Sequence, residues 1–186
     1  MVINRDNPEP EERFNAAVGR AVMTWGYVEW LHSELFQQVA TGQAGNQPLV
    51  RAYWAIVSFE GKHKMVDAAM REALSKHPGF LARWINISNR LQRKSRVRNK
   101  LAHGTLVSPP RHKSGDQLAL VAAVYSKTEW PPEDELLLAE VLDTEASFTK
   151  LGNDMLELQR DHFVEFVREG RKVRRFQYPE ELPPSG

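Results

Sequence analysis

The segment between Glu11 and Ala40 constrains the fold of this 186-residue chain more than any other. Apolar residues recur along it with a period close to 3.6, the period of an amphipathic α-helix. Pro10 stands before two glutamates, and a proline followed by acids favours the first turn of a helix. We therefore expect a long helix over residues 11–40 and a mainly α fold.

Three further segments have helical patterns. Pro48 is expected to open a second helix that runs to about Lys76. A basic segment that starts near Phe80 and reaches Lys100 indicates a third helix, and the turn residues of His77-Pro78-Gly79 precede it. Asp143 or Thr144 is suited to cap a last helix that ends near Arg168. The patterns predict about four main helices.

The chain between the third and fourth of these helices has a different character. Thr105-Leu106-Val107 and residues 117–126 resemble strands, with a turn-rich loop between them. Residues 135–142 are also interpreted as extended, although their Leu, Ala and Glu content favours a helix equally well. We expect a small β-hairpin or antiparallel sheet, inserted at about residues 105–142.

Composition limits the classes of protein to consider. The chain is 41% hydrophobic and 26% charged, which is ordinary for a globular protein. It has no cysteine, a polar N-terminus and no apolar run of about 20 residues, so a cytoplasmic protein without a membrane partner is expected.

We predict a flexible leader over 1–10, a single domain over 11–170 and a tail over 171–186. The tail is basic and aromatic and then proline-rich, which suits either nucleic-acid binding or solubility.

The basic helix ends in an unusual way. Seven Lys or Arg residues and no acid occur between Arg83 and Lys100, although the formal net charge of the chain is only +1. On a helical projection centred on Trp84, the apolar face becomes polar at its C-terminal end, where Ser95, Arg98 and Asn99 replace hydrophobic residues. A buried guanidinium must be paired or must line a cleft. His103 follows Asn99 by one turn, and Gly104 suits a helix C-cap.

The string Arg98-Asn99-Lys100-Leu101-Ala102-His103 resembles the motif of the HEPN superfamily, in which an Arg is followed after four to six residues by a His. The resemblance implies a compact up-and-down helical bundle that dimerises, with the Arg and His of both protomers near the two-fold axis. Many HEPN domains are metal-independent endoribonucleases, often toxins or defence effectors, whereas others bind partners without cutting. It therefore implies an RNA substrate, a homodimer and no cofactor, and it is compatible with a cognate antitoxin or regulatory protein as a further partner.

The resemblance also assigns roles to individual residues. His103 would be the general acid or base, Arg98 would hold the phosphate, and Asn99 would position the substrate or the imidazole. Ser95 would support the site, and Glu29 of the first helix would orient its side chains. Four further cations would attract RNA: Arg93, Lys94, Arg96 and Lys100.

Simpler interpretations remain open for the same residues. Arg98 could pair with Glu29, Glu60 or Asp67 inside the bundle, and His103 could lie at a helix end because the dipole favours a cation there. Glu29 and His32, which interrupt the apolar side of the first helix, could have partners within the bundle. The chain would then be an inactive homodimer that binds a protein or nucleic acid, or a receptor for a nucleotide.

Glu60, His63 and Asp67 lie on one face of the second predicted helix. Their spacing is compatible with a metal site, but it matches no metalloenzyme motif, and no metal is predicted. The preferred interpretation is a polar seam that pairs with the Arg and Lys residues of the third helix.

Overall fold

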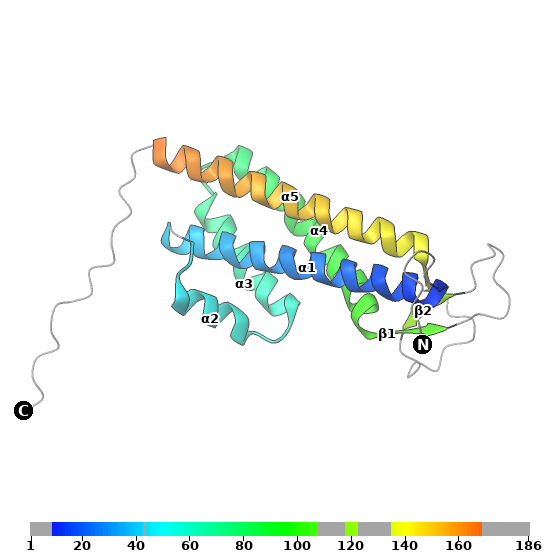
Figure 1. Cartoon of the computed structure of the whole chain (residues 1–186). Coiled ribbons are helices and arrows are strands. Elements are labelled where there is room, and N and C mark those ends of the chain that lie inside the picture. The colour runs from blue at the N-terminus through cyan, green and yellow to red at the C-terminus, as the bar shows by residue number, and fades with distance from the viewer. Residues whose placement is uncertain (1–8, 43, 108–117, 123–134, 169–186) are drawn as a thin grey trace, which may run out of the picture.

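The computed structural model describes residues 9–42, 44–107, 118–122 and 135–168, with the backbone alone for 163–168. Five helices and three short strands lie in these ranges (Figure 1). The fold is therefore mainly α with a small sheet, as predicted. The helices are α1 (Pro10–Thr41), α2 (Gln47–Ala55), α3 (Phe59–Ala73), α4 (Pro78–His103) and α5 (Leu138–Arg168).

Helix α1 confirms the prediction for residues 11–40. Pro10 is its first residue, and Glu11 and Glu12 lie in its first turn. It ends at Gly42, whose φ of 74° is left-handed and whose N–H donates to the carbonyl of Gln38. Along its length, Trp25, Val28 and Leu31 bury one face.

The prediction of a single helix from Pro48 to Lys76 was wrong. The chain forms α2, becomes extended at Ile56, and starts α3 at Phe59. The Ser58 side chain accepts a hydrogen bond from the Gly61 N–H at 3.1 Å, so a serine cap begins a new helix where a continuous one was expected. A Cβ on Gly61 would lie 2.9 Å from Ile56 Cγ2, so this glycine allows the chain to fold back closely.

Helix α4 confirms the basic helix and buries Trp84, Ile87, Ser88 and Leu91, as its projected face required. At its C-terminal end the buried residue is Leu101, and the neighbouring Ala102 is exposed. A helical projection centred on Trp84 predicts Ala102 on the buried face, because it lies within about 60° of Trp84. The apolar face therefore turns toward the sheet over the last turn of the helix.

The three strands are β1 (Gly104–Val107), β2 (Ala119–Ala122) and β3 (Leu136–Leu137), which form an antiparallel sheet in the order β1-β2-β3. The described part of the predicted strand 117–126 is β2.

The extended interpretation of residues 135–142 was wrong beyond Leu137, because α5 begins at Leu138. Helix α5 is therefore not capped at Asp143 or Thr144; at its start the Glu140 carboxylate accepts from the Leu137 N–H at 2.8 Å. Residues 1–8 of the leader predicted over 1–10, the loop over 108–116 and the tail over 171–186 lie outside the described residues, and Pro10 belongs to α1.

Gly104 joins α4 to β1 without being the left-handed cap that its type suggested. Its φ is −74°, which any residue adopts. A Cβ there would lie 2.6 Å from Leu120 Cγ and 2.7 Å from the Lys100 carbonyl oxygen. Glycine is needed because β2 packs directly against the end of α4, immediately after His103.

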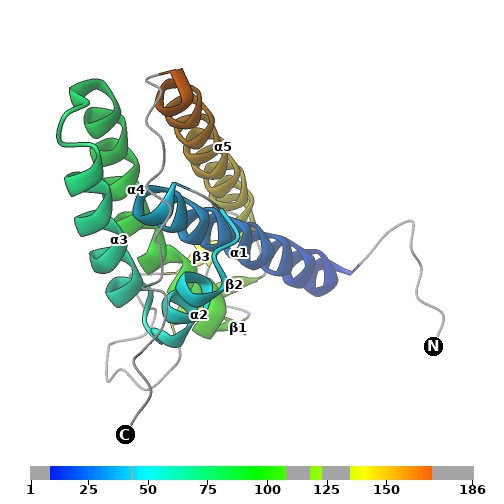
Figure 2. The same ribbon diagram turned by 90° about the vertical axis from the view of Figure 1, so that its left-hand side faces the viewer.

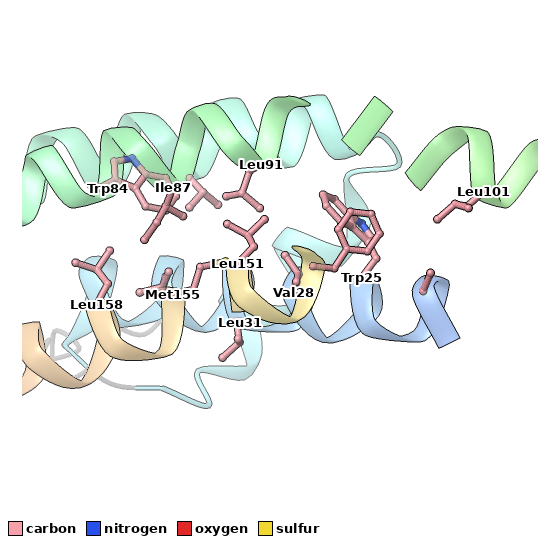
Figure 3. Packing of buried hydrophobic residues seen from close by; sticks show 14 of the residues in the cluster. Trp25, Val28, Leu31, Trp84, Ile87, Leu91, Leu101, Leu151, Met155 and Leu158 are labelled. Carbon is pink, nitrogen blue, oxygen red and sulfur yellow. The ribbon is translucent and has the colours of Figure 1, made fainter. Parts of the chain in front are cut away.

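The main core lies between α1, α4 and α5 (Figure 3). Leu151, Met155 and Leu158 of α5 face Trp84, Ile87 and Leu91 of α4, and Trp25, Val28 and Leu31 of α1 complete the cluster. Helices α1 and α5 run in the same direction, since Arg20 near the start of one pairs with Glu145 near the start of the other. Figure 2 shows α3 and α4 side by side, and it is between these two helices that the candidate site lies.

Candidate functional site

A cleft of about 520 Å³ lies between the N-terminal part of α3 and the C-terminal half of α4. It contains Arg98, Asn99 and Ser95, three of the residues that the motif singled out. Its lining from α4 is Gln92, Ser95, Arg96, Arg98 and Asn99, and its lining from α3 and the preceding connection is Val57, Ser58, Phe59, Glu60, His63 and Lys64.

Arg98 is held at the cleft by a buried carboxylate on α1. Its Nη2 lies 3.7 Å from Glu29 Oε2, and its Nη1 donates to Asn99 Oδ1 at 3.1 Å. Glu29 is only 6% exposed, whereas the Arg98 side chain is 30% exposed. The guanidinium is therefore anchored on one side and reaches solvent on the other. Both the supporting role predicted for Glu29 and the simpler ion-pair interpretation require this contact.

Glu29 has a second cationic partner that the sequence analysis did not identify. Lys62 of α3 is buried, and its Nζ donates to Glu29 Oε1 at 2.6 Å. One carboxylate thus contacts two cations, so the cluster carries a surplus positive charge. Lysine is rarely buried without a partner. No local sequence pattern singled out Lys62, because its partner depends on which helices become neighbours.

The remaining charges of the cleft do not cancel this surplus. Glu60 pairs with Lys64 at 2.6 Å on the exposed side of α3. Arg96 is exposed and adds a further cation to the lining. The lining has three cations and one carboxylate, and the Lys62–Glu29 pair behind Arg98 adds no net charge, so the cleft favours an anionic ligand.

The other predicted site residues are distributed differently. His103 is exposed at the last residue of α4, one turn beyond Asn99, and is not part of the lining of the cleft. Lys94 turns to α5, where its Nζ donates to Ser147 Oγ, and burial lowers its pKa. Arg93 is exposed, and Lys100 is half-buried on the last turn. Only Arg96 of the four predicted RNA-binding cations lines the cleft.

The polar seam of α3 is real, but its partners differ from those predicted. Asp67 Oδ1 accepts from the Ser88 hydroxyl and from Trp84 Nε1, each at 2.9 Å, and Oδ2 accepts from Arg71 of its own helix at 2.7 Å. Partial burial alone would raise the pKa of Asp67, but these hydrogen bonds, led by that of Arg71, lower it overall. The partners on α4 are thus a serine and a tryptophan, and no Arg or Lys of α4 contacts Asp67 among the described residues.

His63 connects this seam to His32, so both histidines have partners inside the bundle. Their rings stack at 5.4 Å, and His63 Nδ1 lies 3.3 Å from His32 Nε2. His32 Nδ1 lies 3.0 Å from the Tyr53 hydroxyl, which donates to the Glu29 carbonyl oxygen at 3.2 Å. At the other end His63 Nε2 lies 3.1 Å from Ser88 Oγ.

The acceptor at each end of this hydrogen-bonded network determines which atoms of the two imidazoles carry hydrogens. The Glu29 carbonyl and the Asp67 carboxylate only accept, so the hydroxyls of Tyr53 and Ser88 must donate outward. Each hydroxyl oxygen then accepts from the nearer imidazole, which makes His32 Nδ1 and His63 Nε2 donors. When both rings are neutral, the inner nitrogens face each other without a hydrogen.

Burial governs the ionisation of this pair. It lowers the pKa of His32 to about 3, with further lowering by His63 and Lys62, against an opposing effect of Asp67. Burial also lowers the pKa of His63, although Asp67 raises it, and Arg71 lowers it further. It raises the pKa of the Tyr53 hydroxyl. The pair is therefore neutral at physiological pH in the folded protein.

No family model, curated protein or solved structure matches the chain. The HEPN resemblance therefore rests on the motif and stays a prediction. No group of three or more metal-ligating His, Cys, Asp or Glu side chains occurs in the described part of the chain. None of the described helices combines the length and the apolar character that crossing a membrane requires.

Proposed function

We propose that this protein is a metal-independent endoribonuclease of HEPN type that works as a homodimer. The observation that carries the proposal is the anchoring of Arg98 at a cationic cleft by the buried carboxylate of Glu29, which Lys62 shares. An arginine fixed in this way presents a planar set of donors to phosphate oxygens at little entropic cost. The absence of a metal from the mechanism is an implication of the resemblance.

The proposed reaction uses the 2′-hydroxyl of RNA. A base removes the 2′ proton, the 2′ oxygen attacks the adjacent phosphorus, and the bond from phosphorus to the 5′ oxygen breaks. An acid protonates the departing 5′ oxygen, which leaves a cyclic phosphate and a 5′-hydroxyl. Arg98 would stabilise the negative charge on the phosphorane, His103 would transfer the proton, and Asn99 would position the substrate.

A dimer would supply the groups that one chain lacks. The reaction needs both a base and an acid, and each chain contributes one His103. His103 is exposed at the end of α4, outside the cleft lining of its own chain. In a two-fold dimer, two His103 and two Arg98 side chains would form one composite site, with Arg96 and Arg93 attracting the RNA.

Cleavage of a mixed RNA pool tests the proposal, with EDTA present throughout. We expect wild type to cut, Arg98→Ala to lower kcat/KM by about 10²–10³-fold, and His103→Ala by about 10²–10⁴-fold. Arg83→Ala is the matched control, because Arg83 also belongs to α4 and pairs with an acid, Asp161, but does not line the cleft. It should cut like wild type. Full activity in His103→Ala, or equal losses for Arg83 and Arg98, would contradict the proposal.

The position of His103 favours one alternative, a homodimer that binds RNA or a protein without cutting it. A histidine outside the cleft lining leaves the cleft suited to binding alone. Binding of RNA with a steep salt dependence, without cleavage by wild type, would support this second function.

A further inference from the structure

We propose that the indole of Trp54 is a stacking platform for one nucleobase of a single-stranded RNA whose phosphate is held by Arg98. This inference rests on the proposed function and specifies its substrate: the strand must be unpaired where it enters the cleft. No sequence motif pointed to Trp54, because the helix break that positions it was not predicted.

Trp54 is an exposed aromatic side chain held in a fixed position. It is 46% exposed, near the end of α2. Lys62 Nζ lies 4.2 Å from its ring centroid, and Tyr53 meets it in an edge-to-face contact at 5.2 Å. Because Lys62 and Tyr53 are both buried, the indole is fixed from behind while much of its surface stays in solvent. A rigid exposed aromatic ring stacks a base with little loss of conformational entropy.

The same lysine connects the indole to the proposed phosphate site. Lys62 Nζ contacts Glu29 Oε1 at 2.6 Å, and Glu29 Oε2 lies 3.7 Å from Arg98 Nη2. Two buried side chains therefore separate Trp54 from Arg98. Val57, three residues after Trp54, is 98% exposed and lines the cleft itself. The chain thus enters the lining of the cleft three residues after the indole.

The chemistry of these groups selects the ligand. Cations that follow a phosphate backbone, together with an aromatic ring that accepts a base, are the two elements of single-strand recognition. A base paired within a duplex is stacked on both faces by its neighbours and cannot lie on the indole. An apolar protein segment would leave the net positive charge of the cleft lining without a partner. A single-stranded RNA uses both features at once.

The test measures binding of a labelled single-stranded RNA by fluorescence anisotropy, with the full chain in a His103→Ala background so that the RNA stays intact. We expect Trp54→Ala to weaken binding roughly 5- to 100-fold, the range for loss of one stacked base. Trp54→Phe should recover most of the affinity, and Trp54→Leu, which keeps apolar volume without an aromatic face, should not.

Trp30→Ala is the matched control. Trp30 is 47% exposed and also packs against an aromatic neighbour, Tyr27, but among the described residues no cation lies over its ring, whereas Lys62 connects Trp54 to Glu29 and Arg98. It should bind RNA like the parent. An oligonucleotide with abasic positions gives a second measurement without changing Trp54: the parent should bind it more weakly than the normal strand, and Trp54→Ala should bind both alike.

The outcomes separate this inference from the function on which it rests. Three results would contradict base stacking on Trp54 without contradicting RNA binding or cleavage. They are equal RNA affinity of Trp54→Ala and the parent, equal losses of affinity in Trp54→Ala and Trp30→Ala, and an affinity of the parent that abasic positions do not change. A parent protein that binds no RNA at all would overturn the inference together with the proposed function.

Discussion

The buried Glu29 has two roles: it contributes to the stability of the bundle, and it positions a residue of the candidate site. Its carboxylate holds Arg98 toward the cleft and neutralises Lys62 inside the bundle. A buried ion pair contributes little net stability relative to an apolar pair, but removing one partner leaves the other charge buried alone. The residue therefore fixes the geometry of the site, and its loss should affect the whole fold.

Glu29→Gln should lower the free energy of unfolding by about 3–5 kcal/mol, because Lys62 loses its charge partner. Urea denaturation measures the change. Glu60→Gln is the control, since the Glu60–Lys64 pair has both side chains more than 70% exposed and should contribute nothing measurable. Equal stability of the two variants would mean that Lys62 finds another partner or reaches water.

The histidine pair predicts a dependence of stability on pH. In the folded protein the pKa of His32 is about 3, and in the unfolded chain it is near 6.5. Below pH 6.5 the unfolded state therefore binds a proton that the folded state does not, and the free energy of unfolding falls. For His32 the loss is about 1.4 kcal/mol per pH unit, and His63 adds to it in the same direction.

Denaturation measured between pH 7 and pH 5, above the range where carboxylates titrate, checks this dependence. His32→Gln should make the dependence shallower, because it removes one of the two buried imidazoles. Stability that stays constant down to pH 5 would show that the folded pair takes up a proton between the two inner nitrogens.

At the scale of elements, the junction of α4 and β1 determines where His103 lies. Gly104→Ala should destabilise the protein by about 1–3 kcal/mol, because its Cβ would overlap Leu120 and the Lys100 carbonyl. Gly26→Ala, in the middle of α1 with nothing within 4 Å of the new Cβ, should instead stabilise it by about 0.5–1 kcal/mol. Thermal unfolding of both variants measures the difference. A Gly104→Ala variant as stable as Gly26→Ala would contradict the close packing of β2.

The sequence was sufficient to predict the elements whose patterns are long. The period of 3.6 in α1 and the basic face of α4 gave both helices to within three residues at each end. The break between α2 and α3 was missed, because Ser58 is a cap only if the chain turns there. Likewise, the Leu and Glu residues of 138–142 are compatible with a strand or a helix. Packing against the core favours the helix, and these residues form the start of α5.

The same limit applies to the candidate site. The polar end of the α4 face correctly indicated a cleft with Arg98, Asn99 and Ser95. Lys62 and Trp54 were missed because their importance depends on which helices become neighbours. A contact between residues 29 and 62 is set by the tertiary fold and leaves no local pattern.

At the scale of the whole molecule, the central claim is that two chains complete one site. Each chain supplies an anchored Arg98 and an exposed His103 at different places on α4. Because the composite site uses the His103 of both protomers as base and acid, a dimer with one His103→Ala chain should be inactive even when its other chain is wild type.

The most direct measurement is therefore the RNA cleavage rate of wild type after mixing with an equal amount of His103→Ala and subunit exchange, with EDTA present. Random exchange leaves about a quarter of the dimers with two wild-type chains, so we expect about a quarter of the rate given by the same total amount of wild type. A rate of about half, which chains acting independently would give, would contradict a site shared between protomers.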